Sequence, residues 1–178
     1  MRIDLDQAFA AIDAANGDDA KAREQGRRAT HWLHRLDPSP SAAVELAARA
    51  HHLRRGTIAR SSFPDGRVGY RRWRAAQKAA LASSMSEALV GLPDDVVARA
   101  VALAQRDGLG TDPETQLVED AACLVFCESD LVLLLDKLGA DRTLDALRKT
   151  VPKMSAAAVA LVAEATPAGP TADLFSRL

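Results

Sequence analysis

Four histidines and a nearby run of arginines are the side chains of this sequence with the clearest chemical potential. His51 and His52 are adjacent, and His31 and His34 stand about twenty residues earlier, one helical turn apart. Imidazole binds iron, manganese, zinc and nickel, and a carboxylate extends such a site toward harder metals. His31, His51 and His52 are therefore candidate metal ligands. The alternative for His31 is a surface residue on a basic helix stripe.

Glu119 and Asp120 supply the carboxylates for such a site. Asp120 shares a helical stripe with Leu124 and Leu131 in the most apolar segment of the chain, and an isolated buried carboxylate is costly. We expect Asp120 to have a partner, which is a metal, a histidine or an arginine. Two interpretations stay open for the two carboxylates: an ion pair with an arginine of the basic segment, or a metal-binding or catalytic role.

The basic segment, residues 54–78, holds eight basic residues and one acidic residue in a chain whose net charge is −1. Arginine suits bidentate contacts with phosphate or carboxylate, and hydroxyl groups add donors. A solvated helix face is the alternative, because several of these residues fall three and four apart. Trp73 is expected in the core. The candidate anion-binding residues are Arg54, Arg55, Arg60, Ser61, Ser62, Tyr70, Arg74 and Lys78.

Length and composition limit the class of protein. The 178 residues are 48% apolar and 26% charged, which is typical of one soluble globular domain and excludes a disordered tail, a fibrous repeat and an integral membrane protein. The near-zero net charge creates no global field toward nucleic acid or an anionic membrane. Two cysteines four residues apart form no disulfide framework, and no signal peptide is recognisable, so we expect a cytoplasmic protein.

Alanine-rich stretches with helical spacing cover most of the chain, and no stretch shows sustained strand alternation. The sequence predicts an all-α single domain over residues 1–178, with about seven or eight helices and a flexible tail from about residue 166. The third helix would carry the histidine doublet, ahead of a loop. The expected helices cover residues 4–15, 20–36, 41–55, 70–90, 94–106, 112–138, 142–150 and 155–165.

The order of these residues resembles the HD-domain phosphohydrolase superfamily, which is all-helical and binds metal through a His, a His-Asp pair and a later Asp. The resemblance implies an HD-like helical bundle with a divalent metal, Fe, Mn or Zn, held by His31, His51, His52 and Asp120. The pair here reads His-His instead of His-Asp. That change makes the site softer and one charge less negative.

The chain also resembles, over most of its length, the bacterial and fungal family known as domain of unknown function 4202. In that family's pattern His52 goes with Arg54, Arg55 and Arg60, whereas His31 and His51 lie outside it. The resemblance implies no activity, and it favours an arginine-lined anion site over a metal site. The matching stretches keep their order: Ile12–Asn16, Leu46–Ala50, His52–Arg55, Arg60–Pro64, Gly69–Tyr70, Trp73–Arg74 and Glu119–Phe126.

These features lead to two hypotheses. The first is an HD-like metal-dependent enzyme, a hydrolase of a small phosphorylated or anionic substrate such as a nucleotide. In it His52, Glu119 and Asp120 are catalytic and the arginines neutralise developing charge. An oxygen-activating iron enzyme is a variant of this hypothesis. The second is a non-catalytic module that binds a nucleotide, another anion or, less readily, RNA. Neither hypothesis involves a membrane, and the oligomeric state is open.

Overall fold

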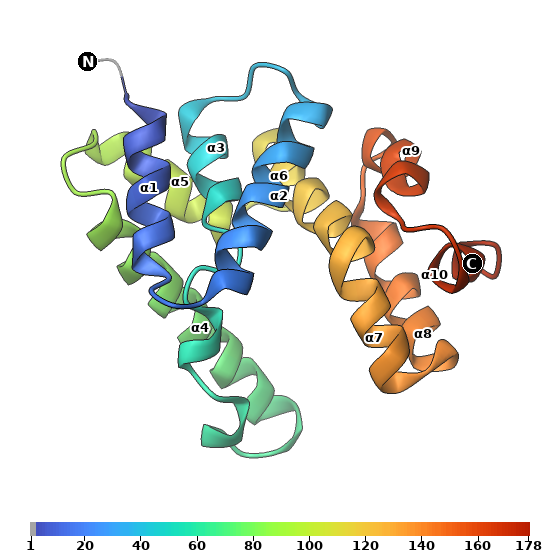
Figure 1. The fold of residues 1–178 in the computed structure, drawn as a ribbon. Coiled ribbons are helices and arrows are strands. Elements are labelled where there is room, and N and C mark those ends of the chain that lie inside the picture. Colours follow the sequence, from blue (N-terminus) through green and yellow to red (C-terminus); the bar gives the residue numbers. More distant parts are fainter. Residues whose placement is uncertain (1–2) are drawn as a thin grey trace.

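The computed structural model describes residues 3–178, and within this range the chain forms helices and irregular segments with no strand. The all-α prediction is confirmed. No helix in the described range is long and apolar enough to span a membrane. In Figure 1 one group of helices is followed by a second at the other side of the molecule. The first is α1 (Leu5–Ala15), α2 (Ala20–Leu36), α3 (Ala42–Arg49), α4 (Gly66–Ala88), α5 (Asp94–Ala104) and α6 (Pro113–Val125); the second is α7 (Leu131–Leu138), α8 (Ala140–Thr150), α9 (Ala156–Ala165) and α10 (Pro170–Phe175).

The helix α6 lies at the centre of the first, larger group, in contact with α2, α3 and α5, and it also contacts α9 of the second group. Its side chains Val118, Ala121 and Leu124 are all buried in the main hydrophobic core, as expected for a helix that is apolar on several faces. A smaller apolar cluster links α7, α8 and α10 through Leu131, Leu147 and Leu174. The segment expected as a tail therefore contains a helix whose Leu174 is packed against its neighbours.

The predicted long helix is present, but it contains a wide turn. α6 and α7 are joined by the π turn η3 (Phe126–Asp130), which accommodates one extra residue. The turn directs two carboxylates toward α2. Glu128 accepts a hydrogen bond from Trp32 Nε1 over 2.8 Å, and Asp130 accepts hydrogen bonds from Gln25. This part of the helix thus adds polar contacts with α2 to the shared hydrophobic core, which includes Trp32 and Cys127.

The third helix is shorter than predicted. It ends at Arg49, and the chain then makes tight turns in place of the expected further helix. His52 and Arg54 have φ angles of +65° and +49°, a left-handed conformation that costs a non-glycine residue free energy. The fold compensates because the Arg54 N–H donates to Asn16 Oδ1 over 3.0 Å and Leu53 is buried. The histidine doublet therefore lies in a turn and not on a helix.

The fourth helix begins at Gly66, ahead of the predicted start at Tyr70. Gly69 permits the early start, because a Cβ atom at this position would lie 1.7 Å from the Pro64 carbonyl oxygen. The segment between α3 and α4 contains two short 3-10 turns, η1 (Arg55–Thr57) and η2 (Arg60–Ser62). It is therefore less irregular than the expected loop.

A close approach between α2 and α3 brings the histidine turn to its partners. A Cβ atom at Gly26 of α2 would lie 2.4 Å from the Arg49 carbonyl oxygen at the end of α3. Glycine in a helix interior is normally unfavourable by about 1 kcal/mol relative to alanine. Here it lets the backbones meet, and the residue before Gly26, Gln25, then faces the turn that follows Arg49.

We expect Gly26→Ala to lower the free energy of unfolding by about 1–3 kcal/mol, because the backbone clash outweighs the gain in helix propensity. Chemical denaturation measures the change. Gly56→Ala is the matched control, since a Cβ atom there has no neighbour within 4 Å and the residue has no positive φ. A Gly26→Ala variant as stable as wild type would contradict the close approach.

Candidate functional site

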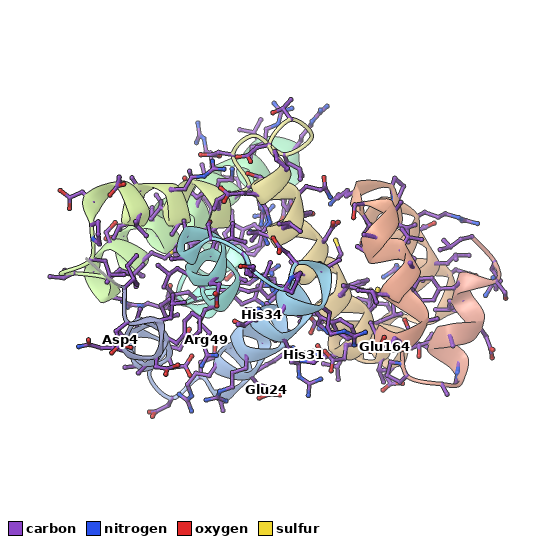
Figure 2. All side chains as sticks on the ribbon, turned by 90° about the horizontal axis from the view of Figure 1, so that it is seen from above. Asp4, Glu24, His31, His34, Arg49 and Glu164 are labelled. Carbon is purple, nitrogen blue, oxygen red and sulfur yellow. The ribbon has the colours of Figure 1, made fainter. Side chains whose placement is uncertain are left out.

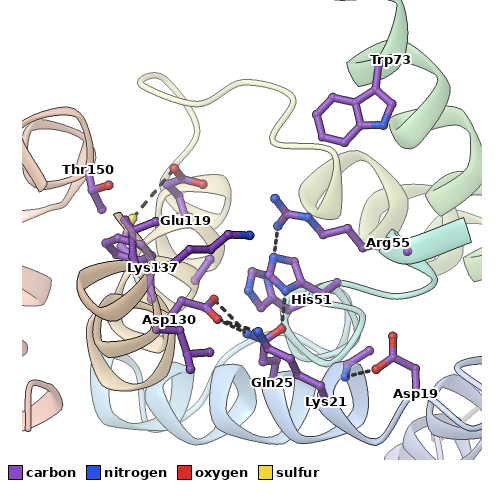
Figure 3. A pocket seen from close by; sticks show the side chains of 18 residues that line it. Asp19, Lys21, Gln25, His51, Arg55, Trp73, Glu119, Asp130, Lys137 and Thr150 are labelled. Carbon is purple, nitrogen blue, oxygen red and sulfur yellow. Dashed lines mark hydrogen bonds and ion pairs between the residues drawn. The ribbon is translucent and has the colours of Figure 1, made fainter. Parts of the chain in front are cut away.

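A cleft opens between α2, the turn after α3, α4 and the α6–α7 helix, and it consists of two adjoining hollows. The first hollow has a volume of about 810 Å³ and the second of about 380 Å³. Figure 3 shows the first hollow with its lining side chains. Six residues line both hollows: His51, His52, Arg55, Trp73, Glu119 and Ala122. They therefore stand where the two hollows join.

The cleft is positively charged, whereas the chain as a whole carries −1. A positive, concave surface in a near-neutral protein concentrates anions there. Of the lining residues, seven are basic and three are acidic: Lys21, Arg55, Arg74, Lys78, Arg106, Lys137 and Lys153 against Asp19, Glu119 and Asp130.

A hydrogen-bond chain from Asp130 to Arg55 fixes the proton positions on His52. Both Asp130 carboxylate oxygens accept from Gln25 Nε2, at 3.0 and 2.9 Å. Gln25 Oε1 then faces His52 Nδ1, and since a carbonyl oxygen only accepts, Nδ1 carries the proton. At the other end Arg55 Nη1 contacts His52 Nε2, which must accept because a guanidinium only donates. His52 is therefore a neutral tautomer with its lone pair on Nε2.

The two imidazole rings of the doublet stack, with centroids 3.9 Å apart and planes inclined by 23°. Burial, and then the positive charge of Arg55, lower the pKa of His52 to about 3. Burial, and then the neighbouring His52, also hold the pKa of His51 well below its ordinary value. Both rings are therefore uncharged at pH 7.

Arg55 reaches the junction of the hollows from η1 and contacts a neutral imidazole instead of a carboxylate. Dehydration by the surrounding protein, and then the positive charge of Arg74, lower the pKa of Arg55. The backbone of Arg55 is held independently of its side chain, because Gln77 Nε2 donates to the Arg55 carbonyl oxygen over 2.9 Å. The Arg55 guanidinium is thus a cation that a bound anion would stabilise.

Glu119 forms an ion pair in the cleft wall, with its Oε2 atom 2.8 Å from Arg106 Nε. Of the two readings open for Glu119, the structure shows the ion pair, but the arginine comes from the end of α5 and not from the basic segment. The Cys123 thiol lies 4.0 Å from Glu119 Oε1, and burial raises its pKa to about 12. This thiol is therefore protonated and unreactive at neutral pH.

Asp120 has partners, but none of the three kinds that we expected. Its side chain is 1% exposed, and Oδ1 accepts from the Ser155 backbone N–H over 2.9 Å and from Gln116 Nε2 over 2.8 Å. Ser155 is the N-cap residue of α9. Asp120 thus fastens the start of α9 to α6, and it lines neither hollow. Its predicted catalytic and metal-binding roles have no support in this geometry.

His31 lies exposed on α2, as the alternative interpretation predicts. Its ring meets Trp32 edge to face, with centroids 5.3 Å apart, and Figure 2 shows it on the same side as Glu164 of α9. Of the four predicted ligands, His51 and His52 line the cleft, whereas His31 and Asp120 line neither hollow. Among the described residues no group of three or more His, Cys, Asp or Glu side chains is placed to hold a metal ion.

The donor chemistry of the doublet also does not fit the divalent metal that the HD resemblance implies. His52 Nδ1 is protonated toward Gln25, and Nε2, the atom left to bind a metal, faces the permanent positive charge of Arg55. A metal ion there would meet a like charge, with no carboxylate of the predicted set to offset it.

The basic segment divides between the cleft and the loop. Tyr70, Arg74 and Lys78 line the second hollow, together with Arg55. Arg60 instead closes the loop by donating to the carbonyl oxygens of Phe63 and Pro64, at 3.0 and 3.1 Å. The predicted residues that line neither hollow are Arg54, Arg60, Ser61 and Ser62.

Trp73 is partly buried and lines both hollows, so its prediction as a core residue is wrong. Its Nε1 atom donates to the Ile58 carbonyl oxygen over 3.0 Å, which fixes the plane of the ring. Tyr70, half-exposed, lies one turn away with ring centroids 5.8 Å apart. The second hollow therefore has an aromatic wall beside its basic residues.

Sequence reasoning missed the partners of the doublet. Gln25 and Asp130 are 105 residues apart in sequence, and Lys21, which forms an ion pair with Asp130 at 3.1 Å, comes from the first turn of α2. The available signal was Gly26 inside a predicted helix, which indicates a close backbone approach at the position next to Gln25. No comparable feature of the sequence indicated that Lys137 lines the first hollow.

Comparison with known proteins gives a family and no activity. Residues 6–174 match the family described as Domain of unknown function (DUF4202), and the chain belongs to this family. No curated protein and no solved structure matches the chain.

The low pKa of His52 predicts an acid-sensitive fold. The folded protein keeps this ring neutral to about pH 3, whereas the unfolded chain takes up a proton near pH 6.5. The free energy of unfolding should therefore fall as the pH drops below 6.5, by up to about 1.4 kcal/mol per pH unit for this residue. Denaturant titrations at pH 7.5, 6 and 5 measure the slope.

The variant His52→Asn should have a shallower slope between pH 6.5 and 5. His31→Asn is the control, since it leaves the doublet intact and should retain the wild-type dependence. Equal slopes in wild type and His52→Asn would mean that the folded protein accepts a proton on this ring.

Proposed function

We propose that this member of the DUF4202 family binds a small phosphorylated organic anion, most simply a nucleotide, in the cleft. The observation that supports it best is Arg55, a guanidinium at the junction of the hollows whose side-chain partner is a neutral imidazole. Arginine is well suited to phosphate because its planar donors match two phosphate oxygens. A bound phosphate would form with Arg55 the ion pair that a carboxylate side chain forms with an arginine in a structural ion pair.

The charges around Arg55 support the same ligand. Two of the three acidic lining residues are already paired, Glu119 with Arg106 and Asp130 with Lys21. Lys137 of the first hollow and Arg74 of the second extend the positive surface in both directions from Arg55. The cleft therefore retains an excess of positive charge along its length, which suits a ligand with more than one anionic group.

The aromatic wall supports a ligand with a planar ring. Trp73 and Tyr70 lie beside Arg74 in the second hollow, and stacking of a base on an aromatic ring contributes about 1–3 kcal/mol. Gln77 donates its amide hydrogens to the Arg55 and Ile58 carbonyl oxygens, at 2.9 and 3.1 Å, which leaves Oε1 as an acceptor. We assign the phosphate end of the ligand to the first hollow and the ring to the second.

Hydrolysis of the bound ligand is the second candidate function. It is favoured by the neutral His52 ring, whose Nε2 lone pair is directed at the proposed anion position by the hydrogen-bond chain. RNA binding is less well supported. The arginines that remain outside the cleft on α4, Arg67, Arg71 and Arg72, are solvent-exposed side chains of one helix.

A cytoplasmic location is part of the proposal. It is supported by Cys123 of α6 and Cys127 of η3, which are both free, buried thiols. Burial raises the pKa of both to about 12. Such thiols serve packing, and they suit a reducing compartment.

Replacing Arg55 should remove most of the anion affinity. We expect Arg55→Ala to weaken pyrophosphate binding by roughly 10–100-fold, because a charge-assisted hydrogen bond contributes about 1.5–3 kcal/mol. Isothermal titration calorimetry at a fixed salt concentration measures it. Arg71→Ala, an exposed residue of α4 outside the cleft, is the matched control and should change the affinity less than about twofold.

Equal losses in Arg55→Ala and Arg71→Ala would contradict a cleft site and indicate diffuse electrostatic binding. A steep dependence of RNA affinity on salt, with no response to pyrophosphate, would favour RNA as the ligand.

Two replacements of Trp73 distinguish the contribution of its aromatic ring to ligand binding from that of its structural hydrogen bond. Both Trp73→Phe and Trp73→Leu lose the donor to Ile58, but only Phe keeps an aromatic face. We expect ADP to bind Trp73→Leu roughly 5–100-fold more weakly than Trp73→Phe, because stacking is lost. Pyrophosphate, which has no ring, should bind the two variants equally. Equal ADP affinities would mean that no ring rests on this wall.

A further inference from the structure

The lone pair of His52 lies where a phosphoryl group would bind. His52 Nε2 faces the Arg55 guanidinium, and the ring on its other side is anchored by Gln25 and Asp130. An imidazole with one nitrogen protonated and held, and the other free of its proton beside a cationic side chain, is arranged as a nucleophile toward phosphorus. A general base that activates water needs the same lone pair, but it needs no cation in contact with it.

From this geometry we infer that His52 Nε2 accepts a phosphoryl group from the ligand that binds the cleft. The inference rests on the proposed binding of a phosphorylated anion and adds a covalent step to it. The Nε2 lone pair forms the N–P bond, while the P–O bond to the rest of the ligand breaks and its electron pair leaves with that oxygen, which takes a proton from solvent. The Nδ1 proton stays in place.

Water completes the cycle. Its oxygen forms a P–O bond as the N–P bond breaks, the electron pair returns to Nε2, and the proton lost by water goes to solvent. The net reaction is hydrolysis of the phosphoester, with His52 restored. Each step uses only the ligand, water and the imidazole.

The surroundings of His52 suit the charges that this step creates. The phosphohistidine ring gains positive charge, which Gln25 Oε1 and the Asp130 carboxylate behind it stabilise through the Nδ1 proton. The phosphoryl oxygens are negative, and Arg55 can turn onto them from Nε2. Only its side chain has to move, because the backbone is held through the bond from Gln77 to the Arg55 carbonyl oxygen.

Gln25 is a positioning residue in this scheme. Its amide is bound at both ends, by Asp130 and by His52, and this orientation determines which ring nitrogen keeps the proton. Gln25→Leu should shift His52 toward the other tautomer, which 15N chemical shifts of the imidazole detect. A purely structural role for Gln25 would leave the tautomer unchanged.

The test uses phosphoramidate, a small P–N phosphoryl donor, with the folded full-length chain. We expect one acid-labile, alkali-stable phosphate on His52, attached at Nε2 as read by 31P–1H correlation, and formed at least tenfold faster than at any histidine of the urea-unfolded chain. His52→Asn should remove it, and His31→Asn, at an exposed residue of α2 outside the cleft, is the matched control that should retain it. Gln25→Leu should slow its formation.

Phosphate on His51 or His31, labelling no faster than in the unfolded chain, or no labelling at all would each overturn the inference. Pyrophosphate binding separates this result from a failure of the proposed function. If wild type binds pyrophosphate in an Arg55-dependent manner but His52 is not labelled, the anion site stands and the covalent step does not. If pyrophosphate does not bind either, the proposed function fails with it.

Discussion

The direction of one hydrogen-bond chain determines which atoms of the cleft are left to act on a ligand. Asp130 can only accept and Arg55 can only donate, so the proton on His52 has one possible position between them. Reversing any link would leave two donors or two acceptors facing each other in a partly dehydrated site, which is costly. The close approach at Gly26, the turn after α3 and the π turn all serve to bring the four members of the chain within reach.

The same chain explains why two histidines can sit in a positively charged cleft. Imidazole protonation would add charge next to Arg55 and deprive Nε2 of its acceptor role, so burial and neighbouring cations both keep the rings neutral. The strain of the left-handed backbone at His52 and Arg54 is part of this arrangement, because a continuing helix would direct the two side chains differently. Backbone strain at such positions is often found where a fold holds a functional group.

Local sequence signals located most of the helices but did not assemble the site. Ser41 and Asp112 accept hydrogen bonds from the first backbone N–H groups of α3 and α6, as their capping preferences predict. The end of α3 was missed because it depends on Asn16, a contact across 38 residues. Asp120 was rightly expected to have a partner. Gln116 lies four residues before it on α6, but the second partner is the N-cap residue of α9, and spacing along α6 contains no information about that contact. The prediction of Trp73 as a core residue was wrong for a related reason, because helical spacing does not distinguish a residue of the core from a residue of a cleft wall.

The π turn gives the cleft a dependence on chain length as well as on residue type. An α-helix rotates by about 100° per residue, so removing a single residue from Phe126–Asp130 would straighten the helix and rotate everything on one side of the deletion by that angle. All the amino acids of the site would still be encoded, yet Asp130 would face away from α2. A relative lacking one residue in this stretch would thus have the same site residues but a different hydrogen-bond network. A gap in a sequence alignment would reveal this difference, whereas a count of matching site residues would not.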